Sequence, residues 1–166
     1  MQHAAAGYDA VMQTPINRVF LGIVTTEEQL VAIDFLEDVP VYSPSTPFSR
    51  RVVVELAAYF RNPRHPVSLP CNGSGTVFQR RVWQALTGIP AGQTLSYGEL
   101  AGKLGSTARP VGGACRANPL PIIVPCHRIV SRHGIGGYCG ENETTRQSRK
   151  LVIKEWLLRH EQTIPA

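Results

Sequence analysis

Apolar and polar positions alternate in short runs along the first part of the chain, a pattern typical of β-strands separated by turns. Residues rich in β-branched and aromatic side chains occupy positions 8–12, 18–25 and 30–35. Polar or proline-containing segments at 14–17 and 26–28 separate these runs. Short β-rich runs bounded by turn residues predict three strands.

A helix and a linker follow these strands. Apolar residues recur at helical spacing through residues 48–60, which predicts an amphipathic helix with one buried face. Residues 62–71 contain three prolines and have the composition of a linker. We therefore expect an N-terminal domain over residues 1–72, linker included, and a C-terminal domain over residues 73–166.

The C-terminal part has the periodicity of helices. Apolar residues mark one helix face over 77–86, and Ile89-Pro90-Ala91-Gly92 ends that helix. The sequence Ser96-Tyr97-Gly98-Glu99 is a capping box, because the Ser96 hydroxyl can accept a free amide while Glu99 reaches back to Ser96. The helix that it starts is expected to run to about Leu104 and to stop at Gly105.

Another short helix is predicted directly afterwards, over residues 108–117. Ser106 or Thr107 can cap its start, and Pro110 falls in its first turn, where a missing N–H costs little. Two helices joined by so short a turn resemble a helix-turn-helix.

This second helix has little side-chain bulk and two positive charges. Gly112 and Gly113 lie inside it, and each costs about 1 kcal/mol relative to alanine. Close approach of the helix backbone to another surface would offset that cost. Arg109 and Arg116 are seven residues apart and so share a face. Tight helix packing with solvated arginines is one interpretation, and contact with DNA is the other.

The distribution of charge favours DNA. Residues 1–74 carry five Lys or Arg and seven Asp or Glu, whereas residues 75–166 carry twelve and five. An asymmetry of this kind is expected if only the second part meets a polyanion.

Composition excludes several other classes. With 43% hydrophobic and 17% charged residues among 166, the chain is typical of a globular protein with one or two small cores. No apolar run approaches the roughly 20 residues of a membrane helix, and the N-terminus lacks the features of a secretory signal, so a cytoplasmic location is expected. The four cysteines, at 71, 115, 126 and 139, show neither C-x-x-C pairs nor zinc spacing. We expect no disulfide framework, no metal and no cofactor.

The candidate catalytic residues lie in the segment Pro125-Cys126-His127-Arg128. This segment closes the apolar run Pro121-Ile122-Ile123-Val124, which we expect to be a buried strand ending in a turn. A cysteine attacks as its thiolate, and a neighbouring imidazole or cation raises the thiolate fraction. An inert core cysteine beside a surface histidine is the ordinary alternative. Prolines at 119, 121 and 125 and the permanent charge of Arg128 favour the reactive interpretation.

Taken together, these motifs resemble the 6-O-methylguanine-DNA alkyltransferases, also called methylated-DNA–protein-cysteine methyltransferases. The resemblance covers most of residues 76–161 in order, whereas the N-terminal half is similar only loosely, mainly through Thr14-Pro15-Ile16. The similar stretches are Phe78-Gln79-Arg80-Arg81-Val82-Trp83, Ile89-Pro90-Ala91-Gly92-Gln93-Thr94, Ser96-Tyr97-Gly98-Glu99-Leu100-Ala101, Ala108-Arg109-Pro110-Val111-Gly112, Asn118-Pro119, Pro125-Cys126-His127-Arg128-Ile129-Val130, Gly136-Gly137-Tyr138 and Leu157-Leu158-Arg159-His160-Glu161.

The resemblance implies a role for each matching residue. Cys126 would accept the alkyl group, while His127, through a water, and Glu161 would relay charge to make it a thiolate. Tyr97 would donate a hydrogen bond to the guanine and help to rotate its phosphate.

The resemblance also implies a DNA-binding surface and a base pocket. Arg109 would enter the duplex in place of the flipped nucleotide, and Asn118 would hold the turn between the recognition helix and the cysteine segment. The implied DNA-binding residues are Arg109, Arg116, Asn118, Arg128, Gly112 and Gly113. The implied pocket residues are Ile129, Ser131 and Tyr138, together with the backbone around Cys126.

The implied fold class is α/β (α+β), with a ribonuclease-H-like N-terminal domain and a winged-helix-type C-terminal domain that carries the helix-turn-helix. The implied activity is DNA repair by direct reversal, in which one protein accepts one alkyl group irreversibly. The implied partner is double-stranded DNA containing alkylated guanine, with 4-O-methylthymine as a second candidate substrate. The protein is expected to be monomeric.

The chain departs from the family pattern in three places. Pro110 stands where alanine is usual, the stretch 136–141 is less glycine-rich, and the polar segment 142–149 is longer. The second departure brings Cys139 and Glu141 toward the expected pocket wall, and a neighbouring carboxylate disfavours a thiolate at Cys139.

Three other functions remain open from the sequence. A DNA-binding regulator would explain the helix-turn-helix and the charge but not the Pro-Cys-His-Arg turn. A non-catalytic sensor of alkylated bases would lack the cysteine. A cysteine hydrolase would have no use for a basic helix-turn-helix.

Overall fold

The computed structural model describes residues 7–136 and 149–162, and the chain divides into two compact units, Met1–Ser74 and Gly75–Ala166. Each unit is described by itself. Within the described residues no helix is long and apolar enough to cross a membrane.

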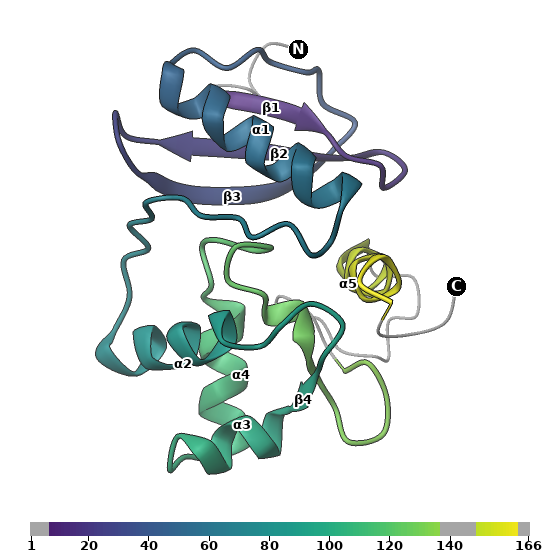
Figure 1. Cartoon of the computed structure of the whole chain (residues 1–166). Helices are drawn as coiled ribbons and strands as arrows, with labels where there is room; N and C mark the ends of the chain where they lie inside the picture. The colour runs from purple at the N-terminus through teal and green to yellow at the C-terminus, as the bar shows by residue number, and fades with distance from the viewer. Residues whose placement is uncertain (1–6, 137–148, 163–166) are drawn as a thin grey trace. The chain divides into compact units, whose positions relative to one another are not determined.

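The first unit is an antiparallel sheet with one helix on it. Strands β1 (Ala10–Gln13), β2 (Val19–Thr25) and β3 (Leu30–Glu37) lie in the order β1-β2-β3. Helix α1 (Pro47–Arg61) covers one face of this sheet and packs on β1 and β2 (Figure 1). The three predicted strands and the predicted helix are therefore confirmed.

Hydrogen bonds fix the start of α1 and the end of the segment that follows it. Thr46 caps α1, since its hydroxyl accepts from Ser49 N at 3.0 Å and its own N–H donates to Ser49 Oγ at 3.0 Å. The segment expected to be a linker is helix-free, as its prolines predict. Its end is not free, however, because Leu30 N donates to Pro70 O and Asn72 N to Leu30 O, both at 2.9 Å.

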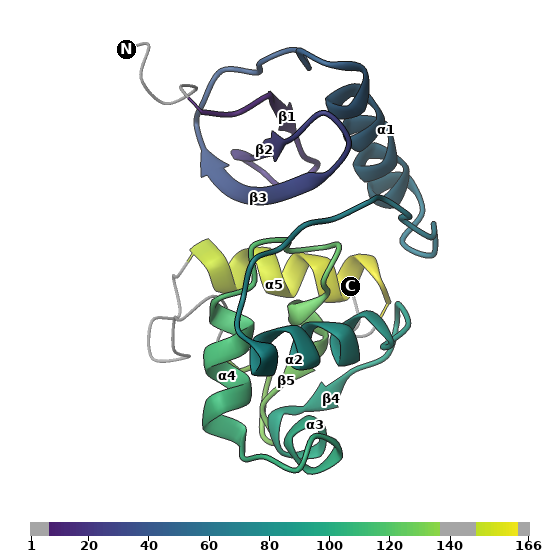
Figure 2. The ribbon, with the colours of Figure 1, turned by 90° about the vertical axis from the view of Figure 1, so that its left-hand side faces the viewer.

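The second unit is mainly helical. It contains α2 (Val77–Thr87), β4 (Leu95–Ser96), α3 (Tyr97–Lys103), α4 (Ala108–Arg116), the 3-10 turn η1 (Cys126–Arg128), β5 (Ile129–Val130) and α5 (Arg149–His160). Helices α2 and α3 both pack against α4, and η1 packs against α5 and α2 (Figure 2). Strands β4 and β5 pair in parallel, with Leu95 opposite Ile129 and Ser96 opposite Val130.

The predicted helix-turn-helix is present as α3 and α4. The capping box is confirmed, because Glu99 N donates to Ser96 Oγ at 3.1 Å and Ser96 N donates to Glu99 Oε2 at 2.7 Å. Gly105 ends the first helix with a φ of 63°, which favours glycine. Thr107 is the N-cap residue of α4 but makes no side-chain capping hydrogen bond, so the expected side-chain cap is wrong.

The expectation of a strand over 121–124 is also wrong. These residues form a turn, in which Val124 N donates to Leu120 O at 2.8 Å and Ile122 has a φ of 75°. The prolines at 119, 121 and 125 lack the N–H groups that a strand ladder needs. In this stretch of the chain, regular strand structure begins only at β5 (Ile129–Val130).

Replacing Thr76 with alanine is expected to destabilise the second unit. Thr76 caps α2, with its hydroxyl accepting from Gln79 N at 3.1 Å while Gln79 Oε1 accepts from Thr76 N at 2.9 Å. Loss of such a cap costs about 1 kcal/mol. Urea unfolding should show a lower midpoint for Thr76→Ala and a near-normal midpoint for Thr76→Ser. Equal midpoints for both variants would contradict a capping role.

Candidate active site

The reactive-cysteine candidate is the first residue of η1 and is almost fully buried. Asn118 fixes its surroundings, because the side-chain amide donates to Val124 O at 2.8 Å and to Cys126 Sγ at 3.2 Å. The amide oxygen of Asn118 accepts from Leu120 N at 2.9 Å. One side chain at the end of α4 therefore holds both the turn and the sulfur.

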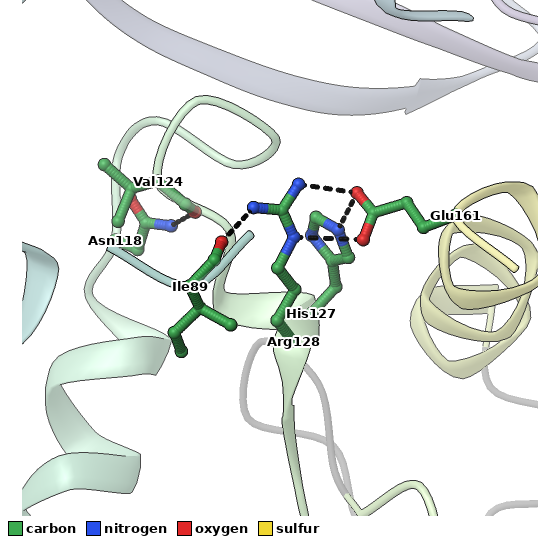
Figure 3. A network of polar contacts seen from close by, with 6 residues as sticks. All are labelled: Ile89, Asn118, Val124, His127, Arg128 and Glu161. Carbon is green, nitrogen blue, oxygen red and sulfur yellow. Dashed lines mark hydrogen bonds and ion pairs between the residues drawn. The ribbon is translucent and has the colours of Figure 1, made fainter. Parts of the chain in front are cut away.

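His127, the residue after this cysteine, belongs to a buried network with Arg128 and Glu161 (Figure 3). His127 Nε2 lies 2.9 Å from Glu161 Oε1, and neither side chain is exposed. Arg128 donates from Nε to Glu161 Oε2 at 3.0 Å and from Nη2 to Oε1 at 2.8 Å, and its remaining nitrogen Nη1 bonds to Ile89 O. The carboxylate reaches in from the end of α5, so η1, α5 and the loop after α2 meet at one point.

The environment sets the protonation of this pair. Burial lowers the pKa of His127, although the hydrogen bond to Glu161 and the charge of that carboxylate act in the opposite direction. Burial alone would raise the pKa of Glu161, but the hydrogen bonds and charges of His127 and Arg128 outweigh it and hold the pKa well below its usual range. The imidazole is therefore neutral near pH 7, and the permanently charged Arg128 is the ionic partner of the carboxylate.

The same contacts select the tautomer of His127. An ionised carboxylate can only accept, so the proton of the neutral ring lies on Nε2. The other nitrogen, Nδ1, then has a free lone pair. It is buried and has no hydrogen-bond partner among the described residues. The arrangement leaves a proton acceptor on the residue next to the thiol.

Tyr97 opens α3, at the point where β4 ends. A Cβ at Gly112 of α4 would lie 3.9 Å from the ring, and a Cβ at Gly136 would lie 3.4 Å from it. Gly136 has a φ of 72°, and its Cβ would also come within 2.9 Å of Ser131 N. Gly112 and Gly136 thus both lie next to the Tyr97 ring, and Gly136 also lies against the predicted pocket residue Ser131.

Lys154 is a buried charged residue that the sequence interpretation missed. Its side chain is fully buried, Nζ donates to Ile129 O at 2.6 Å, and Nζ lies 5.9 Å from the centroid of the Tyr97 ring. Its position among the apolar residues of α5 could have identified it from the sequence. Lys154 lies three residues after Leu151 and three before Leu157, on the buried stripe of α5.

The predicted DNA-binding residues divide into two groups. Arg109, Gly113 and Arg116 are exposed on α4, and a Cβ at Gly113 would meet nothing within 4 Å. No internal packing therefore requires glycine at that position. Arg128, by contrast, is only 12% exposed and is engaged by Glu161 and Ile89. The structure therefore places Arg128 in the buried network and not on the exposed face of α4.

Other predicted features carry less information. Tyr138, Cys139 and Glu141 lie outside the described residues, as does most of the 142–149 segment. Burial raises the pKa of the Cys115 thiol to about 12, and burial also raises that of Cys71. Within residues 7–136 and 149–162, no group of three or more His, Cys, Asp or Glu could hold a metal ion.

Comparison with known proteins decides the family. A family described as "6-O-methylguanine DNA methyltransferase, DNA binding domain" matches residues 77–163. The chain belongs to the 6-O-methylguanine DNA methyltransferase family.

Individual relatives agree with this assignment. The methylated-DNA–protein-cysteine methyltransferase of Methanosarcina acetivorans is 35% identical over 162 residues, which cover 93% of this chain and 97% of that protein. The Salmonella typhimurium protein of the same name is 47% identical over 111 residues, and the match spans 64% of this chain but only 60% of the relative's length. The solved structure of Mycobacterium tuberculosis OGT in complex with DNA is 33% identical, with a TM-score of 0.74 and 94% of each chain covered. The mixed α/β fold is therefore that of the family.

Proposed function

We propose that this methyltransferase family member repairs DNA by moving the alkyl group of 6-O-methylguanine onto Cys126. The observation that carries the proposal is the buried network of His127, Glu161 and Arg128 directly beside Cys126. The name of the Methanosarcina relative and the DNA-bound Mycobacterium structure support the same activity.

Activation of the thiol is the first step of the proposed mechanism. The thiol proton passes through a bridging water to Nδ1 of His127, which the structure leaves as an acceptor. The resulting imidazolium is stabilised by Glu161, whose carboxylate stays ionised because Arg128 holds it. A thiolate forms where the neutral thiol would be a weak nucleophile.

Displacement at the alkyl carbon follows. The sulfur forms a bond to that carbon, the bond from carbon to the guanine oxygen breaks, and its electron pair leaves with the base. Tyr97 donates a hydrogen bond that strengthens as negative charge builds on the guanine. The product is a thioether, so each protein reacts once.

Flipping of the nucleotide precedes the chemistry, because an alkylated base inside a duplex is out of reach of a buried thiol. Arg109 is proposed to fill the gap that the base leaves, since its planar guanidinium can stack and hydrogen-bond. Gly112 and Gly113 let the backbone of α4 approach the DNA, and Arg116 meets a phosphate. Ile129, Ser131 and Tyr138 are proposed to line the base pocket, and Asn118 to hold the turn between α4 and the cysteine segment.

The same proposal covers the domain types, the oligomeric state, the location and the range of substrates of the protein. The first unit would be of the ribonuclease-H type and the second of the winged-helix type. The protein would act as a monomer on double-stranded DNA, in the cytoplasm and without a cofactor. Alkylated thymine is a second candidate substrate.

Intact-mass measurement after incubation with a duplex carrying one 6-O-methylguanine tests the proposed function. We expect a permanent gain of one methyl group, in a burst equal to the protein concentration and without later turnover. Tight binding with no gain in mass would instead indicate a regulator or sensor. Continued turnover with an unmodified protein would indicate a hydrolase.

Replacing Arg109 and Arg116 separately is expected to give different defects. Arg109→Ala should slow alkyl transfer more than it weakens binding to undamaged duplex, because it acts after the base has left the stack. Arg116→Ala should weaken binding to all duplexes and lower the salt slope by about 0.9, the contribution of one phosphate contact. Arg61→Ala, at the exposed end of α1, serves as the control for a lost charge. Identical effects of Arg109→Ala and Arg116→Ala on binding and transfer would contradict the two roles.

A further inference from the structure

We propose that the turn over residues 131–134 is a second DNA-contacting element, in which Arg132 binds a backbone phosphate of the lesion-bearing strand. The inference rests on the proposed function and adds a contact that lies outside the helix-turn-helix. It is carried by the rigidity of the turn, its distance from Tyr97 and the exposure of its arginine.

The turn is held rigidly by its own contacts. It follows β5 directly, and Ser131 and Gly134 form an antiparallel bridge. The Ser131 hydroxyl also donates to Gly134 O at 3.1 Å. Arg132 and His133 stand at the tip and are both exposed. A basic side chain on a short, closed turn loses less conformational freedom on binding than one on a loose loop.

The position of the turn is fixed relative to Tyr97. Because Ser96 pairs with Val130 in the parallel β4–β5 ladder, the chain leaves both strands at the same end, one strand into Tyr97 and the other into Ser131. Gly136 closes this corner, since a Cβ there would approach both Ser131 N and the Tyr97 ring. The turn therefore borders the place where the proposed substrate base is bound.

The charge of Arg132 is available to a ligand. Within the described part of the chain its side chain makes no hydrogen bond or ion pair. Glu99 lies within its electrostatic reach, because the pKa of Glu99 is lowered by hydrogen bonds from Ser96 and also by the charges of Lys103 and Arg132. The Glu99 carboxylate is already committed to the Ser96 cap, and the nearby cation Lys103 adds to the positive potential.

A phosphate is the ligand that fits these features. A guanidinium presents paired donors that match phosphate oxygens. A closed turn of four residues lacks the length of a helix or ribbon that reaches base edges in a groove. A flipped nucleotide also displaces its own backbone, which brings a phosphate toward the rim of the pocket.

Equilibrium binding of the full chain to duplex DNA as a function of salt tests this contact. Arg132→Gln should lower the slope of log K against log salt by about 0.9, so that raising salt fourfold weakens its binding about 3.5-fold less than it weakens the wild type. The matched control is Arg64→Gln, an exposed arginine of the first unit with the same change of charge. Neutral methylphosphonate linkages, placed singly around the lesion, identify the phosphate. One of them should weaken the wild type but should not weaken Arg132→Gln further.

The outcomes separate this inference from the function on which it rests. A wild type that neither binds duplex nor gains a methyl group overturns both. A wild type that transfers methyl normally, with Arg132→Gln matching Arg64→Gln in salt slope and methylphosphonate response, overturns the phosphate contact alone. A change in sequence preference without a change in salt slope would assign Arg132 to a base edge and would also overturn it.

Discussion

Cys126→Ala is expected to abolish alkyl transfer while the protein still binds lesion-containing duplex. The substitution removes the sulfur, but the turn around it remains bonded, because Asn118 still donates to Val124 O and accepts from Leu120 N. Burial raises the pKa of the Cys115 thiol to about 12 and also raises that of Cys71, so neither of these described thiols is favoured as a thiolate. Intact mass and a DNA-binding titration measure the two properties on one sample.

Cys115→Ala is the matched control for this experiment. It removes a buried thiol of the same size from the same unit, on the inner side of α4. We expect it to retain transfer at nearly the normal rate. A methyl gain in Cys126→Ala, or loss of transfer in Cys115→Ala with DNA binding intact, would mean that the wrong cysteine has been identified.

Glu161→Gln is expected to slow alkyl transfer about 100-fold or more, the range typical of a lost proton-transfer component. The amide keeps the size of the carboxylate and can accept a hydrogen bond, but it has no charge to stabilise a protonated His127. It also leaves the buried charge of Arg128 without its anion, which is destabilising. Thermal unfolding and binding to undamaged duplex must therefore accompany the rate, so that loss of fold is not mistaken for loss of chemistry.

Glu155→Gln is the control for Glu161→Gln, since it makes the same change on the same helix. Glu155 pairs with Arg159 at 2.6 Å, but both side chains are 44% exposed. Exposed pairs of this kind contribute about 1 kcal/mol or less. This variant should transfer alkyl groups at the normal rate. If its rate fell as far as that of Glu161→Gln, the effect would come from a general disturbance of α5 and not from the carboxylate of Glu161.

The pH dependence separates an electrostatic role of Glu161 from a merely structural one. Transfer requires neutral His127, so the rate falls as pH drops through the pKa of that residue. Burial lowers this pKa below the ordinary 6.5, and the decline should therefore begin only below pH 6.5. The hydrogen bond that His127 donates to Glu161 raises the same pKa. Its loss in Glu161→Gln should move the decline to still lower pH while the plateau falls. A lower plateau with an unmoved decline would indicate a structural role.

Local patterns predicted the elements of the fold better than the network between them. The strands of the first unit and the Ser96 capping box follow from residues within a few positions of each other. Glu161 and His127 are 34 positions apart, and no periodicity connects them. Their pairing was inferred from family resemblance alone.

The differences between the sequence expectations and the structure have physical causes. The resemblance places Arg128 among the DNA-binding residues, whereas in the structure its guanidinium bonds to Glu161 and to Ile89 O. The apolar run over 121–124 suggested a strand, although its prolines remove the amides that a ladder needs. Lys154 passed unnoticed because a lysine within a helix is ordinarily solvated.

Helix α5 carries Lys154 and leads directly into Glu161, so the proposed activation of the thiol depends on the docking of a segment that follows it in the chain. On the proposed mechanism, a chain in which α5 is not packed on η1 would lack the carboxylate partner of His127, and its Cys126 would react as an ordinary cysteine. A polypeptide emerging from the ribosome would be in this state until α5 had been made and packed. If each protein reacts once, as proposed, this dependence would keep incomplete chains from using their single methyl transfer.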